Sequence, residues 1–178
     1  MAAKKDVFSI RIDDFLFKNI SELTEFFNEE LLKNKISRNN LLENAIVKGI
    51  KYYYKMAEEH CRNARQQEKL KKIQCEFDEY LLDNFKEYKK ENKTICIDAY
   101  YHELLKAYCR FENNIYNRDW SVNGLIIGSV INGILFYIQT DRQFITNMNI
   151  QIEEYNYEFL MDEITIITKK QYLKMEFR

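Results

Sequence analysis

Apolar and polar residues alternate in the stretch "FSIRID" (8–13), which is the spacing of a β-strand with one covered face. The apolar positions are Phe8, Ile10 and Ile12, and the polar positions are Ser9, Arg11 and Asp13. Apolar residues then recur at helical spacing in two runs, which contain Leu16, Ile20, Leu23, Phe26 and Leu31 and then Leu42, Ile46, Ile50 and Tyr53. Ser37 precedes the second run in the position of an N-cap. Residues 1–55 are therefore predicted to form a strand, a helix, a turn and a second helix.

The same order of patterns returns in residues 93–139. "KTICIDA" (93–99) matches "FSIRIDD" (8–14), and "SVNGLIIGSVINGILFY" (121–137) matches "SRNNLLENAIVKGIKYY" (37–53). Ser121 takes the N-cap position that Ser37 has in the first copy. The helical run between strand and serine contains Tyr101, Leu105, Tyr108, Phe111 and Ile115. The chain is therefore predicted to contain two copies of one strand–helix–helix unit.

The stretch from Trp120 to Ile138 carries no charged residue and has nearly the length of a membrane span. It also contains serines and asparagines, which are costly in hydrocarbon, and its flanks show no positive side. A phosphate-binding loop would need Gly-Lys-Ser/Thr after its glycines, and that motif is missing. Because the stretch repeats residues 37–53, we interpret it as a buried helix of a soluble fold.

Two further segments complete the predicted organisation. Residues 56–92 begin with a charged run and continue with an amphipathic one, which predicts a helical linker between the copies. From Asn149 the spacing changes to alternation, so residues 140–178 are predicted to form a small antiparallel β hairpin or meander. This extension either covers the apolar second copy, which we favour, or presents a surface to a protein partner or an effector. The expected fold class is thus mostly α with short β.

Composition and charge exclude several functions. The formal net charge of −1 favours no particular partner, although residues 1–55 are mildly basic. The first residues show no signal-peptide pattern, so we expect a cytoplasmic protein. Four widely spaced cysteines and two histidines predict reduced thiols, no metal site and no other cofactor. Neither His60 nor His102 has a nucleophile or paired carboxylates at an informative spacing, so no catalytic residue and no enzyme activity is predicted.

A six-residue strand needs a partner strand and a covered face to be stable. Two such strands paired with their apolar sides on the helices would form a ribbon whose other side carries Ser9 and Arg11. A two-stranded ribbon fits the DNA major groove, where an arginine can bond guanine O6 and N7 with about 1–3 kcal/mol of discrimination. With these features, residues 6–55 resemble the MetJ/Arc ribbon-helix-helix superfamily of DNA-binding proteins. Residues 93–139 resemble it more weakly.

The resemblance implies roles for named residues. In the family the paired strands read bases, while the N-terminus of the second helix holds a phosphate. Carried over to this chain, the base-reading residues are Ser9 and Arg11, with Asp13 on the same strand face, and the phosphate-binding residues are Ser37, Arg38 and Asn39. The second copy departs from this pattern because it has Thr94, Cys96 and Val122 where the first has Ser9, Arg11 and Arg38. There, Thr94 and Cys96 are expected at the bases, and Ser121 and Asn123 at the phosphate.

Two assemblies follow from the repeat. The two copies of one chain pair in an intramolecular pseudo-dimer, which we favour because tethering raises the effective concentration, or each copy pairs with its twin in a homodimer. The predicted partner is double-stranded DNA, and the predicted function is a sequence-specific transcriptional repressor, antitoxin or replicon-control regulator. The alternative is an adaptor or scaffold, as in plasmid partition, whose second half binds a protein partner. No membrane association is expected.

Overall fold

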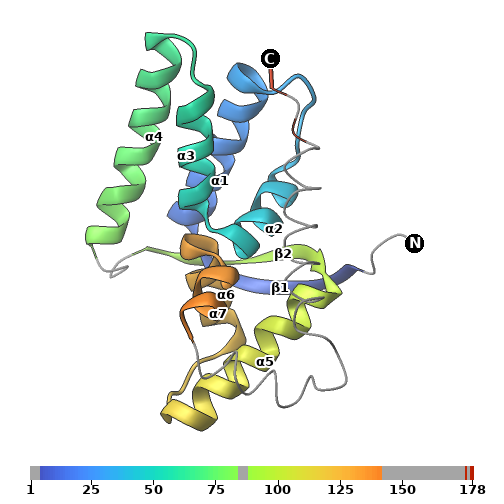
Figure 1. Ribbon diagram of the computed structural model, residues 1–178. Coiled ribbons are helices and arrows are strands. Elements are labelled where there is room, and N and C mark those ends of the chain that lie inside the picture. Colours follow the sequence, from blue (N-terminus) through green and yellow to red (C-terminus); the bar gives the residue numbers. More distant parts are fainter. Residues whose placement is uncertain (1–4, 84–87, 142–174, 176) are drawn as a thin grey trace.

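The computed structural model describes residues 5–83, 88–141, 175 and 177–178 (Figure 1). In this part of the chain the elements are β1 (Lys5–Asp13), α1 (Asp14–Phe26), the π-helical turn η1 (Phe27–Leu31), α2 (Arg38–Lys48), α3 (Ile50–His60), α4 (Ala64–Leu82), β2 (Lys90–Asp98), α5 (Ala99–Tyr116), α6 (Val122–Asn132) and α7 (Ile134–Thr140). The described chain is mostly helical with one small antiparallel sheet, which confirms the predicted class at that level. The β extension predicted for residues 140–178 lies almost entirely outside the described residues.

β1 and β2 pair antiparallel along their full length. Ser9 lies opposite Thr94 at the centre, and the ends pair Lys5 with Asp98 and Asp13 with Lys90. Because Ser9 and Thr94 are equivalent positions of the two copies, the ribbon has local two-fold symmetry. It crosses the middle of the molecule, with α1, α3 and α4 above it in the view of Figure 1 and α5 below it. The strands of one chain thus pair with each other, as in the first of the two assemblies considered above.

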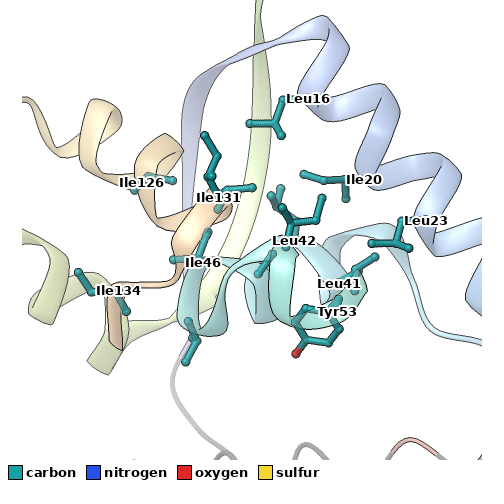
Figure 2. Packing of buried hydrophobic residues seen from close by; sticks show 14 of the residues in the cluster. Leu16, Ile20, Leu23, Leu41, Leu42, Ile46, Tyr53, Ile126, Ile131 and Ile134 are labelled. Atoms are coloured by element: carbon teal, nitrogen blue, oxygen red, sulfur yellow. The ribbon is translucent and has the colours of Figure 1, made fainter. Parts of the chain in front are cut away.

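One continuous apolar core holds both units together. We call β1, α1, η1, α2 and α3 the first unit, and β2, α5, α6 and α7 the second. Figure 2 shows side chains from both units meeting in this core: Leu16, Ile20 and Leu23 from α1, Leu41, Leu42 and Ile46 from α2, Tyr53 from α3, Ile126 and Ile131 from α6, and Ile134 from α7. The inward faces of the ribbon also belong to it, through Ile10, Ile12, Ile95 and Ile97. The units are therefore two halves of one packed body.

The second helix predicted for each copy is broken by a glycine. Gly49 separates α2 from α3 and Gly133 separates α6 from α7, and both have φ of 85°. A Cβ atom on Gly49 would lie 2.5 Å from the carbonyl carbon of Asn132, and one on Gly133 would lie 2.5 Å from that of Lys48. The two backbones therefore touch where α2 crosses α6, and only glycine fits at either position. The prediction of one continuous helix was wrong at this point because the contact between the copies could not be foreseen from either copy alone.

Three further predictions concern the capping serines, the apolar helical runs and the uncharged stretch. Ser37 accepts a hydrogen bond from the Asn40 amide at 3.1 Å and Ser121 from the Gly124 amide at 3.0 Å, so both are N-caps. The apolar run of α1 is buried, whereas Ile115 at the end of the α5 run is 48% exposed, contrary to prediction. The residues from Trp120 to Ile138 form α6 and most of α7, and no described helix is long and apolar enough to cross a membrane.

Candidate nucleic-acid interface

The outer face of the β1–β2 ribbon brings together four of the five residues predicted to read bases. Ser9, Arg11 and Thr94 are exposed and Cys96 is half-buried, while the alternate isoleucines face the core. The cross-strand pairs on this face are Val7 with Cys96, Ser9 with Thr94 and Arg11 with Asn92. Val7 and Asn92 are thus members of this face that the sequence analysis did not single out. Strand alternation places both residues on the outer face, and the register shows which residues they oppose.

Asp13 is the exception among the predicted base-reading residues. Its side chain is only 3% exposed, and its Oδ2 accepts a hydrogen bond from the Tyr80 hydroxyl at 2.7 Å. Burial and this bond raise the pKa of Tyr80, so the hydroxyl stays protonated and donates a hydrogen bond to the carboxylate. The structure places Asp13 in the core, because α4 packs beside the end of β1 and supplies the partner. The assignment of Asp13 to the exposed face is therefore corrected.

The cations at the ribbon differ in their surroundings. Arg11 and Lys90 are exposed, and within the described part of the chain neither side chain forms a hydrogen bond or an ion pair. Lys5, in contrast, pairs with the buried Glu43, which also accepts a hydrogen bond from the Asp98 amide at 3.0 Å. Arg11 is thus a charge near the centre of the outer face that is available to a ligand.

The first turns of α2 and α6 are fastened to the two edges of the ribbon by asparagines. Asn123 accepts from the Arg11 amide at 2.7 Å and donates to the Arg11 carbonyl at 3.0 Å. Asn39 forms the equivalent pair with the amide and carbonyl of Cys96, both at 3.2 Å. The side-chain amide of asparagine has a carbonyl oxygen that accepts and an NH2 group that donates. It can therefore bond the free N–H and C=O of a strand edge as a neighbouring strand would.

These contacts change the roles assigned to the two asparagines. Both were predicted to lie at the phosphate, and because their side chains are engaged by the strands, only their backbone amides can serve there. Each asparagine is the second residue of its helix and binds the strand of the opposite unit. We therefore assign Asn39 and Asn123 to positioning: they hold each helix start beside the ribbon, where the capping serines Ser37 and Ser121 remain exposed.

Arg38, the first residue of α2, lies on a small cationic cluster. Its guanidinium stands 4.2 Å from the centroid of the Phe17 ring and donates to the Ser21 hydroxyl at 3.2 Å. The ammonium of Lys93 lies 4.6 Å from the same ring centroid. Two cations therefore flank the start of α2, although Lys93 also pairs with Glu91 at 2.6 Å. Of these residues only Arg38 was predicted from the sequence; Phe17 and Lys93 join the cluster through the packing of α1 and β2.

The corresponding place in the second unit has different chemistry. Val122 stands where Arg38 stands in the first unit, and Phe8 stacks on His102 with ring centroids 4.2 Å apart. His102 Nδ1 lies 3.0 Å from a carboxylate oxygen of Asp6. The residues equivalent to Arg38, Phe17 and Lys93 are thus Val122, His102 and Phe8, and none of these is an arginine or a lysine.

The described residues offer no candidate metal site. They contain no group of three or more histidine, cysteine, aspartate or glutamate side chains placed to hold a metal ion. Comparison of the chain with family models, with curated proteins and with solved structures gives no match. The ribbon and the helix starts beside it are therefore the candidate functional surface.

Proposed function

We propose that this protein binds double-stranded DNA by placing the outer face of the β1–β2 ribbon in the major groove. It would act in the cytoplasm as a sequence-specific regulator, such as a repressor, an antitoxin or a replicon-control protein. The observation that carries the proposal is a two-stranded antiparallel ribbon whose inner side is buried and whose outer side exposes Ser9, Arg11 and Thr94 around a local two-fold axis.

The ribbon has the chemistry needed for direct readout. A two-stranded ribbon is narrow enough for the major groove, and a free guanidinium can bond the O6 and N7 atoms of guanine together. Arg11 is exposed and forms no ion pair with a described residue, so no internal bond has to break first. Ser9, Thr94 and Asn92 add hydroxyl and amide groups that can donate and accept at base edges.

The N-termini of α2 and α6 would bind the phosphates of the DNA backbone. The N-terminus of a helix attracts phosphate through unpaired amides and the helix dipole, and α2 and α6 both begin beside the ribbon. Arg38 and Lys93 add positive charge at α2, whereas Val122 adds none at α6. We therefore propose that the start of α2 binds the backbone more strongly than the start of α6.

The arrangement supports a tandem ribbon-helix-helix protein in which one chain supplies both halves of the usual dimer. Each unit contributes one strand, and the units meet through α2 and α6. Since the two strands differ at Arg11 and Cys96, the preferred DNA site would not be palindromic. A homodimer with twin strands would prefer a palindrome instead.

Selection from a random duplex pool tests this function. The wild-type chain is compared with Arg11→Ala and with Arg62→Ala, a matched control in the connection between α3 and α4, far from the ribbon (Figure 1). We expect wild type and Arg62→Ala to enrich the same short site, and Arg11→Ala to lose preference at one or two positions. If folded wild-type protein enriches no site, or if Arg11→Ala keeps the full preference, the proposal is wrong.

An adaptor that binds a protein is the second candidate, and one observation favours it. Ile115 and Phe136 of the second unit are 48% and 53% exposed, so both offer apolar contacts to a protein partner. Salt dependence separates the candidates: a DNA-binding protein that neutralises phosphates loses affinity for duplex steeply as salt rises. An adaptor that does not contact DNA would show no such slope.

A further inference from the structure

A cavity of about 360 Å³ lies beside the first half of α6. Its walls include the rings of Trp120 and Tyr137 and the side chain of Leu125, and two glycines of α6, Gly124 and Gly128, line it as well. Its size is within the range of cavities that hold small organic ligands. The ribbon proposal does not use this cavity.

Missing side chains on α6 keep the cavity open. In the first unit, Asn40 and Asn44 occupy the positions that correspond to Gly124 and Gly128. Each glycine inside a helix lowers helix stability by about 1 kcal/mol relative to alanine, so the two glycines make α6 less stable than alanines would. A Cβ on Gly128 would lie 2.9 Å from the Tyr137 hydroxyl oxygen, so even a methyl group would crowd the aromatic wall.

The aromatic walls are held in place before any ligand arrives. The backbone amide of Trp120 donates to Asn113 Oδ1 at 2.8 Å, and its carbonyl accepts from Asn113 Nδ2 at 2.9 Å. The Arg118 guanidinium lies 5.0 Å from the indole centroid, and the indole and Tyr137 rings meet edge to face with centroids 6.3 Å apart. Fixed rings around an apolar space favour a planar apolar group as ligand.

The charge at the lining is negative. Asp119 lines the cavity, is exposed, and forms no ion pair or hydrogen bond with any described residue. The adjacent Arg118 does not offset it, because that guanidinium pairs with Glu112 at 3.0 Å. A ligand with a positive charge next to its ring would therefore complement this lining.

We propose that the cavity binds a small aromatic amine, with its ring against Trp120 and Tyr137 and its ammonium group at Asp119. Ser121 also lines the cavity, so the site adjoins the start of α6. The proposal does not depend on DNA binding, because the test uses the protein and small probes alone, and either proposal can fail without the other.

The test uses phenethylamine as the probe, with phenethyl alcohol as its neutral counterpart and 3-phenylpropionate as its anionic one. Trp120 is the chain's single tryptophan, so the indole N–H signal in a nitrogen–proton correlation spectrum reports on the cavity directly. We expect that signal to shift and saturate with phenethylamine, more weakly with the alcohol, and least with the carboxylate. No saturable shift with any probe, or equal binding of all three, overturns the proposal.

Two substitutions and one matched control locate the binding. Gly124→Leu fills the cavity and should abolish the shift, whereas Asn40→Leu at the equivalent position of α2 should leave it unchanged. Asp119→Asn removes the charge of an exposed side chain that forms no hydrogen bond or ion pair with a described residue. It should weaken the binding of phenethylamine severalfold and leave the binding of phenethyl alcohol unchanged. Unaltered phenethylamine binding in both Gly124→Leu and Asp119→Asn would show that the probe binds elsewhere and would refute the site.

Discussion

The two units share a frame and differ in what surrounds it. Both have isoleucines on the inner side of the strand and a capping serine at the start of the helix that follows. Both also have a helix asparagine that bonds the strand of the opposite unit, and a glycine where α2 crosses α6. The first unit has Arg11 on the ribbon, and the start of its α2 carries Arg38 with Lys93 beside it. At the places related by the local two-fold axis stand Cys96, Val122 and Phe8.

The difference separates structural positions from functional ones. Of the positions that are alike, the asparagines and the glycines contact the opposite unit, and the serines cap their own helices. Changing either member of a pair therefore breaks the same kind of contact. Positions that differ are exposed or lie beside the helix starts, where the frame does not dictate the side chain. Under the proposed function, the first unit supplies both arginines of the DNA interface, while the second adds Lys93, completes the ribbon and contains the cavity.

The largest effects are expected at the crossing glycines. Gly49→Ala and Gly133→Ala each force a Cβ into the opposite backbone at a positive φ, which should cost about 3 kcal/mol or more of unfolding free energy. Chemical denaturation measures this, with Gly124→Ala as a control expected to stay within about 1 kcal/mol. Equal losses of stability at both positions would support the equivalence of the two glycines, and a loss at only one of them would contradict it.

The Tyr80–Asp13 bond is specific to the first unit. Tyr80→Phe removes the hydroxyl that bonds the buried Asp13 carboxylate, so we expect a loss of about 2 kcal/mol in unfolding free energy. Tyr88→Phe is the matched control, since that hydroxyl makes only a 3.5 Å contact with Asp83, and its effect should be under about 0.5 kcal/mol. Equal effects of the two substitutions would contradict the placement of Asp13 in the core.

The asparagines should behave as an equivalent pair. Asn39→Ala and Asn123→Ala each leave one strand edge without its partner, which should cost about 1–2 kcal/mol. Amide hydrogen exchange gives the sharper result: Asn123→Ala should speed exchange at Arg11 and leave Cys96 protected, and Asn39→Ala should do the reverse. Exchange that rises at both amides in either variant would show general loosening of the ribbon.

The smallest effects concern the charges at the helix starts. Arg38→Ala should weaken all duplexes similarly and reduce the salt dependence of binding by about one phosphate contact. The converse substitution, Val122→Arg, places a cation at the start of α6. It should raise the affinity for duplex DNA and its salt dependence by similar amounts. Binding measured across a salt series checks both, and unchanged slopes would exclude phosphate contact at these helix starts.

Much of the frame could be predicted from the sequence because it depends on local patterns. The alternation at residues 8–12, the helical spacing in α1 and the capping serines act within one unit, and they were predicted correctly. What could not be predicted depends on contacts between distant residues. Tyr80 reaches Asp13 from another helix, and Asn123 reaches Arg11 from the opposite unit.

The glycine crossing illustrates the same limit. Each glycine interrupts an otherwise helical pattern, and only the approach of the other copy explains why. Likewise, the candidate site was located by the register of the strands, which placed Asn92 and Val7 beside the predicted residues. Strand alternation predicted which side Arg11 would face, but not that the Asp13 carboxylate would be buried.

Titration of the isotope-labelled chain with a mixed-sequence DNA duplex at low salt tests the central claim most directly, because it does not require the preferred site to be known. The account predicts that amide signals shift along β1 and β2, at Ser9, Arg11 and Thr94, and in the first turns of α2 and α6, while those of α4 remain in place. Signals that do not shift, or shifts confined to the exposed apolar residues of α5 and α7, would contradict it.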